Sequence, residues 1–107
     1  MSARPRTAPS AALVYATLRE LLDPEVGINV VDLGMVGEVV VTPDGAAVVE
    51  IRPTTPGCPM HDALGNGVQR LVGALPGVTA VEVQFVYEPP WTPDLIAPDA
   101  RALLGLR

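Results

Sequence analysis

Thr54-Thr55-Pro56-Gly57-Cys58-Pro59-Met60 is the stretch that decides the fold, because a strand-like run ends just before it and a helix-like run begins just after it. It holds the only cysteine among the 107 residues. Pro59 suits the first position of a helix, where its missing N–H is no loss. We therefore expect Cys58 to be the N-cap residue of that helix, at its positive end.

The residues before this stretch predict a β-hairpin. Residues 38–42 and 46–52 are rich in valine and isoleucine, which favour strands. The intervening Pro43-Asp44-Gly45 is typical of a tight turn, because proline presets the entry and Asp and Gly tolerate unusual dihedral angles. We expect the two strands to pair antiparallel.

The residues after it predict a helix and a third strand. Residues 62–75 repeat apolar side chains at helical spacing, and Pro76-Gly77 ends that pattern. Residues 78–87 alternate between apolar and polar side chains, which is typical of a strand with one buried face.

Outside the central elements, the sequence predicts a flexible N-terminal segment and one helix toward each end of the domain. Residues 1–9 predict a flexible segment, and residues 10–107 predict a single domain. Residues 10–22 predict an amphipathic helix that Ser10 caps and that ends at Asp23-Pro24, because proline disfavours helical geometry in the residue before it. A short last helix is expected to begin near Pro98.

The predicted order is helix, strand, strand, helix, strand and a short C-terminal helix. These elements form a three-stranded mixed sheet with both main helices on one face, which is an α/β (α+β) two-layer sandwich. We expect the first strand of the hairpin to lie between the other two strands.

Composition excludes several classes of function. All seven basic residues are scattered arginines and the net charge is -5, which argues against nucleic-acid binding because that needs a clustered basic surface. One cysteine excludes an intrachain disulfide, and no apolar run approaches the roughly 18 residues that span a bilayer. A reducing cytoplasm is the expected location, and no membrane contact is expected.

The chemistry predicted for Cys58 follows from its expected place at a helix N-terminus. Free backbone N–H groups and the helix dipole favour the thiolate over the thiol there. His61 lies within one turn and could act as a base or as a second metal ligand. The plainer alternatives are a buried Cys58 that acts as a small hydrophobe and an exposed first-turn His61.

Asp32 is the second residue singled out, because a carboxylate between Val31 and Leu33 is costly to bury unless it is hydrogen-bonded. It either ties down the backbone of the Gly34 bend or faces the Cys58 pocket. Thr55 either ends the strand or hydrogen-bonds within the cysteine loop.

Three further residues have open interpretations. Asp23 and Glu25 flank Pro24, where a helix stop is the favoured interpretation over a catalytic pair. For Trp91, the only tryptophan, covering the core and docking a partner are both open.

Other chemistries are excluded by the residues present. The chain has no Gly-rich phosphate loop, no Ser/His/Asp set and no Cys-x-x-Cys pair. An iron–sulfur cluster normally takes four thiolates, so one chain cannot hold such a cluster unaided.

Five motifs occur in order along the chain: Leu22-Asp23-Pro24-Glu25, Val31-Asp32-Leu33-Gly34-Met35-Val36, the opening stretch, Leu75-Pro76-Gly77-Val78 and Pro89-Pro90-Trp91. With them the chain resembles the family of small iron–sulfur cluster assembly domains that includes SufT and PaaD. The resemblance runs from about residue 10 to the C-terminus and also implies the two-layer fold.

The resemblance implies a function and several site residues. It implies a factor for iron–sulfur protein maturation in the manner of the SUF system, more an accessory protein than an enzyme. It places the reactive cysteine at Cys58 and the pocket residues at Asp32 and Thr55, which favours the functional interpretation of Asp32. PaaD-type members carry a cysteine-bearing C-terminal extension that this sequence lacks, so a SufT-like role is expected. Ala97 stands where relatives tend to have a Ser or Thr helix cap.

The implied cargo is iron or a transient iron–sulfur cluster, bound by Cys58 and, as a weaker candidate, His61, with no cofactor held tightly by one chain. The expected partners are iron–sulfur assembly proteins and client apoproteins, and a homodimer would bring two Cys58 thiols together. Three alternatives stay open. They are a thiol enzyme with Cys58 as nucleophile and His61 or Asp32 as base, a PaaD-like factor for a multicomponent monooxygenase, and an interaction module with Cys58 buried.

Overall fold

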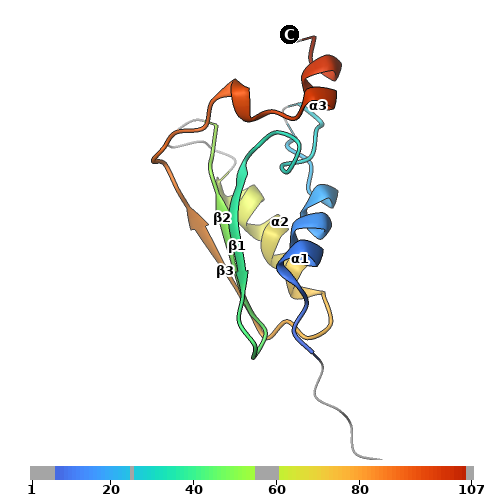
Figure 1. Ribbon diagram of the computed structural model, residues 1–107, viewed down its shortest axis with the longest axis vertical. Coiled ribbons are helices and arrows are strands. Elements are labelled where there is room, and N and C mark those ends of the chain that lie inside the picture. The colour runs from blue at the N-terminus through green and yellow to red at the C-terminus, as the bar shows by residue number, and fades with distance from the viewer. Residues whose placement is uncertain (1–6, 25, 55–60, 106–107) are drawn as a thin grey trace, which may run out of the picture.

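The computed structural model describes residues 7–24, 26–54 and 61–105. Along the chain its elements are α1 (Ala11–Thr17), the 3-10 turn η1 (Leu18–Glu20), β1 (Val36–Val41), β2 (Ala46–Ile51), α2 (His61–Gly73), β3 (Ala80–Phe85), the 3-10 turn η2 (Pro93–Leu95) and α3 (Pro98–Leu103). This is the predicted element order. Figure 1 shows the sheet beside α1 and α2, with η2 and α3 across one end of the molecule.

The strand order differs from the prediction. β1 and β2 pair antiparallel, β2 and β3 pair parallel, and the sheet order is β1-β2-β3, so the second hairpin strand is central. The expectation that the first strand is central was therefore wrong. A physical reason lies in β1, whose pairing with β2 is irregular between Val36 and Val39, because such bulges are common at sheet edges. In its central place, β2 is the one strand among the described residues with no exposed position.

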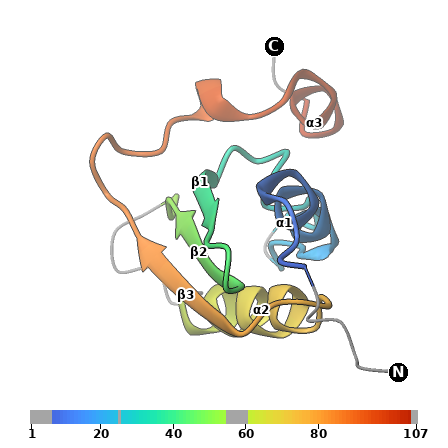
Figure 2. The same cartoon turned by 60° about the horizontal axis from the view of Figure 1, so that its bottom comes forward.

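The core lies between one face of the sheet and the two longer helices. Ala47, Val49 and Ile51 of β2 point into it and are almost fully buried. Val14 and Leu18 come from the N-terminal helical segment, and α2 adds three more core residues, Leu64, Val68 and Val72. Figure 2 shows α1 and α2 on the same side of the sheet. The predicted two-layer architecture is confirmed.

The first helix begins where it was predicted to begin but ends earlier than predicted. Ser10 is the N-cap, and its hydroxyl oxygen accepts a 3.0 Å hydrogen bond from the Leu13 N–H. The helix tightens into η1 and stops at Glu20, before Asp23-Pro24. Leu22 instead bridges to Asn29 in an extended pair, so Asp23 lies in a loop and is not the residue that ends the helix.

The remaining boundaries fall within a few residues of the predictions. The hairpin turn forms at Pro43-Asp44-Gly45, where Gly45 has φ +95° and a Cβ would lie 2.1 Å from the Gly77 carbonyl oxygen. A side chain therefore does not fit at this contact between the two turns. α3 starts at Pro98 as expected. Within the described ranges, the helices are too short or too polar to cross a membrane.

Candidate functional site

The segment of residues 21–35, here called the 21–35 loop, joins the first helical segment to β1 and supports the candidate site. It is tied together by backbone hydrogen bonds. The Asp23 N–H donates to the Ile28 carbonyl at 2.9 Å, and the Val30 N–H donates to the Leu21 carbonyl at 2.9 Å. Asp23 is 8% exposed, so the loop buries a carboxylate residue next to the core.

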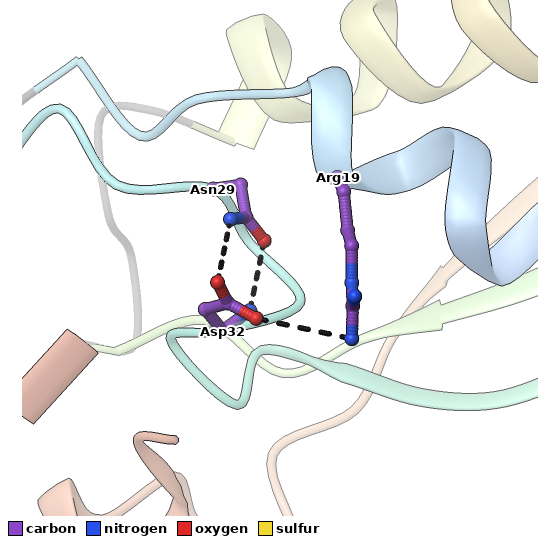
Figure 3. Close-up of polar contacts among 3 residues, drawn as sticks. All are labelled: Arg19, Asn29 and Asp32. Atoms are coloured by element: carbon purple, nitrogen blue, oxygen red, sulfur yellow. Dashed lines mark hydrogen bonds and ion pairs between the residues drawn. The ribbon is translucent and has the colours of Figure 1, made fainter. Parts of the chain in front are cut away.

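Asp32 is held within this loop by Asn29 (Figure 3). The Asn29 Nδ2 donates to Asp32 Oδ2 at 2.9 Å, and the Asp32 backbone N–H donates to Asn29 Oδ1 at 2.9 Å. Two bonds between the same pair of residues fix both the side chain and the backbone of Asp32. The backbone of this bend is therefore braced by the Asn29 side chain.

Arg19 adds a weaker contact to the same carboxylate. Its Nη2 lies 4.0 Å from Asp32 Oδ1, and the two side chains are 59% and 33% exposed. Ion pairs that are this open to water contribute about 0–1 kcal/mol. Asn29 therefore determines the position of Asp32, and Arg19 adds a positive charge beside it.

Two consecutive carbonyls of the 21–35 loop hold the C-terminal part of the chain. The Trp91 Nε1 donates to the Leu33 carbonyl at 2.7 Å, and the Ala97 N–H donates to the Asp32 carbonyl at 2.7 Å. Trp91 is half-buried and packs against the core. Of its two interpretations, covering the core is therefore the one that the structure supports. Ala97 is the N-cap of α3 and makes no side-chain cap bond, as its methyl side chain requires.

A pocket of about 330 Å³ lies between the 21–35 loop and the C-terminal segment. One wall comes from the loop and the segment that follows β2, namely Asp23, Val26, Leu33 and Thr54. The other wall comes from the C-terminal segment, namely Trp91, Pro93, Ile96 and Leu104. The lining is mostly apolar with few polar groups, which is typical of a binding pocket.

The pocket lies next in sequence to the cysteine stretch. Thr54 lines it, and Thr54 is followed directly by Thr55 and the rest of the predicted cysteine loop. Cys58 and Thr55 lie outside the described residues, so the predicted helix cap stays a prediction. His61 is the first residue of α2, and its side chain is also outside the description.

The structure separates the two aspartates of the loop. Asp23 lines the pocket, whereas Asp32 pairs with Asn29 and Arg19 and is not among the lining residues. Reasoning from the sequence missed the places of Asn29 and Arg19. The spacing Asn29-x-x-Asp32 was an available signal, because Asn and Asp side chains often bond the backbone of a turn. In the described part of the chain, acidic, histidine and cysteine side chains form no cluster of three that could hold a metal ion.

Asn29→Ala is expected to loosen the 21–35 loop. It removes the two bonds to Asp32 and leaves the Asp32 N–H without its acceptor, so we expect a loss of about 1–3 kcal/mol in the free energy of unfolding. Urea denaturation measures this loss. Asn66→Ala, at an exposed position of α2, is the matched control and should stay within about 0.5 kcal/mol of wild type. Equal effects of the two variants would contradict the bracing role of Asn29.

The chain is similar in sequence to known proteins. A family model described as "Iron-sulfur cluster assembly protein" matches residues 11–84. The Fe-S protein maturation auxiliary factor SufT of Staphylococcus aureus (strain USA300) is 36% identical over 86 residues, covering 80% of this chain and 98% of SufT. The factor YitW of Bacillus subtilis (strain 168), with the same description, is 33% identical over 88% of this chain and 92% of its own length.

A solved structure shares the fold. The crystal structure of a Domain of Unknown Function DUF59 from Bacillus anthracis superposes with a TM-score of 0.85 at 33% identity, covering 91% of this chain and 92% of that one. The similarity extends over nearly all of both chains, so it is not confined to the three strands of the sheet.

Proposed function

The chain belongs to the iron–sulfur cluster assembly protein family, and from this premise we propose that it is a SufT-like maturation factor for iron–sulfur proteins. The observation that carries the proposal is the extent of the likeness to an iron–sulfur maturation factor, of which this chain covers 98%. A likeness that runs through the whole domain supports the same kind of role more strongly than a shared motif would.

Cys58 is the residue that we propose contacts the cargo, which is iron or a transient iron–sulfur cluster. One thiolate supplies one of the four ligands that a cluster normally takes, so the remaining ligands come from a partner, a second chain or a small thiol. His61 is a candidate second ligand. The single thiol makes the chain a point of transfer, because a cluster with one protein ligand is easily passed on.

Asp32 and Thr55 are proposed to support the cysteine. The Asn29 bonds fix the carboxylate of Asp32, and Arg19 lies beside it. Because Asn29 holds Asp32 in one orientation within the 21–35 loop, a positioning role is the one that we propose for Asp32.

The pocket beside Thr54 is proposed as the place where a client apoprotein or an assembly protein docks. Its mostly apolar lining, and the presence in that lining of Thr54, the first residue of the Thr54–Met60 stretch, support this use. A homodimer that brings two Cys58 thiols together and a cytoplasmic location remain part of the proposal. The lone cysteine supports both, because two thiols need two chains and a single cysteine forms no intrachain disulfide.

Rescue in cells tests the maturation role. In a bacterial host that lacks its own factor of this kind, expression of the wild-type chain should raise the specific activity of an iron–sulfur hydro-lyase several-fold. A hydro-lyase without a cluster, measured in the same extracts, is the control and should not change. Equal effects on both enzymes, or no rescue by a chain shown to be folded and expressed, would contradict the proposal.

A further inference from the structure

The outer wall of the pocket is built by one continuous segment, residues 91–104, which we call the strap. Figure 1 shows it crossing one end of the molecule, apart from α1 and α2. Trp91, Pro93, Ile96 and Leu104 of the strap face the pocket, while the opposite wall belongs to the body of the domain. Any movement of the strap therefore changes the pocket.

The strap is hydrogen-bonded to two adjacent carbonyls of the 21–35 loop. Trp91 and Ala97 donate to the adjacent carbonyls of Leu33 and Asp32. Between these two bonds the strap lies directly on Gly34, where a Cβ would be 2.2 Å from the Leu95 carbonyl oxygen. Gly34 also has φ +74°, so glycine serves both the bend and the close contact. These two bonds are fewer than those of the strand ladders, and the buried side chains of Ile96 and Ala100 complete the attachment.

The strap has hydrogen bonds of its own that are independent of the body. The Ile96 N–H donates to the Pro93 carbonyl within η2, and the Arg101 N–H donates to the Ala97 carbonyl within α3. The Arg101 Nη1 donates to the Pro93 carbonyl at 2.8 Å and so links the two turns. These bonds persist when the fastening breaks, so the strap can move as one piece.

The strap is also the part expected to separate first. α3 has six residues and no side-chain cap bond at Ala97, and helices this short are marginal without packing. Within the strap only Ile96 and Ala100 are buried, whereas every second residue of β2 is buried. Segments with few buried residues open at lower free energy than the core. Leu103 is 80% exposed, so part of the apolar side of α3 already faces water.

We propose that residues 91–104 form a strap that detaches from the Asp32 and Leu33 carbonyls while the sheet stays folded, and that this opening controls access to the pocket. The proposal deepens the maturation role by stating what regulates its docking site, and it rests on that role only for the identity of the occupant. It is tested on the iron-free full chain. Its failure would leave the maturation role standing.

Native-state hydrogen exchange of the full-length protein measures the opening. In the wild type, the Ala97 amide should exchange faster than the amides of β2. Trp91→Phe removes the indole donor and keeps an aromatic ring, so protection at Ala97 should fall about tenfold while the β2 amides are unchanged. Leu103→Ala, at an exposed strap position, is the control and should have no effect.

Thiol labelling measures access to the pocket. In a Cys58→Ser background, Thr54→Cys places a thiol on the body wall, and a small maleimide should label it about tenfold faster when Gly34→Ala pushes the strap away. Gly34 is not among the lining residues, so the variant replaces no side chain of the lining. The proposal would be overturned if the Ala97 amide and the β2 amides of the wild type exchanged at equal rates. It would also be overturned if Trp91→Phe lowered protection equally at Ala97 and in β2. An unchanged labelling rate in a folded Gly34→Ala protein would overturn it as well.

Discussion

Cys58→Ala is expected to abolish rescue of the iron–sulfur hydro-lyase in the host described above, bringing its specific activity down to the level without the chain. The reason is that the chain has a single thiol, so no other side chain can supply a thiolate as ligand or nucleophile. The measurement is the activity of the iron–sulfur hydro-lyase divided by that of the hydro-lyase without a cluster in the same extract. Wild type and variant are compared at matched expression.

The control must separate chemistry from folding. Alanine is smaller than cysteine, so the variant should be compared with wild type in urea denaturation before its activity is interpreted. Leu103→Ala changes an exposed apolar residue elsewhere and should rescue as well as wild type. Full rescue by Cys58→Ala would show that the thiol is not the point of contact with the cargo.

Leu18→Ala is expected to have the largest effect on stability. Leu18 is fully buried in the core between the helices and the sheet, so its removal leaves a cavity. Such substitutions cost about 2–5 kcal/mol. Small domains are stable by about 5–15 kcal/mol, so the variant should lose a large part of its free energy of unfolding. Urea denaturation followed by circular dichroism measures the loss.

Leu13→Ala is the matched control for this substitution. It makes the same chemical change in the same N-terminal helical segment, at a side chain that is 47% exposed. We expect a change within about 0.5 kcal/mol. If both variants lost the same amount, Leu18 would not hold the core position that the structure gives it.

The sequence predicted the elements of this fold well because their signals are local. The Ser10 cap and the Pro43-Asp44-Gly45 turn depend on neighbouring residues, and both formed as expected. The strand order was missed because it depends on pairing between strands that are distant in sequence. β3 pairs with β2, to which it is connected through α2, and this pairing has no local signal.

The candidate site was predicted less completely, for a related reason. Asp32 was found from its apolar neighbours in sequence, but Arg19, which lies beside it, belongs to η1 and was out of reach of local reasoning. Asp23 was interpreted as a helix stop because the pocket wall opposite it comes from the distant residues 91–104. Cys58 and Thr55 lie outside the described residues, so their roles remain predictions from the sequence.

Anaerobic reconstitution with iron and sulfide tests the central claim, which is that Cys58 holds the cargo as a single transferable ligand. Wild type and Cys58→Ala are compared by absorption spectrum and native mass. We predict iron and sulfide on the wild type only, in species that contain a second chain or an added small thiol, because one thiolate leaves ligand positions open. Equal iron and sulfide on the Cys58→Ala protein, or on neither protein, would contradict the account.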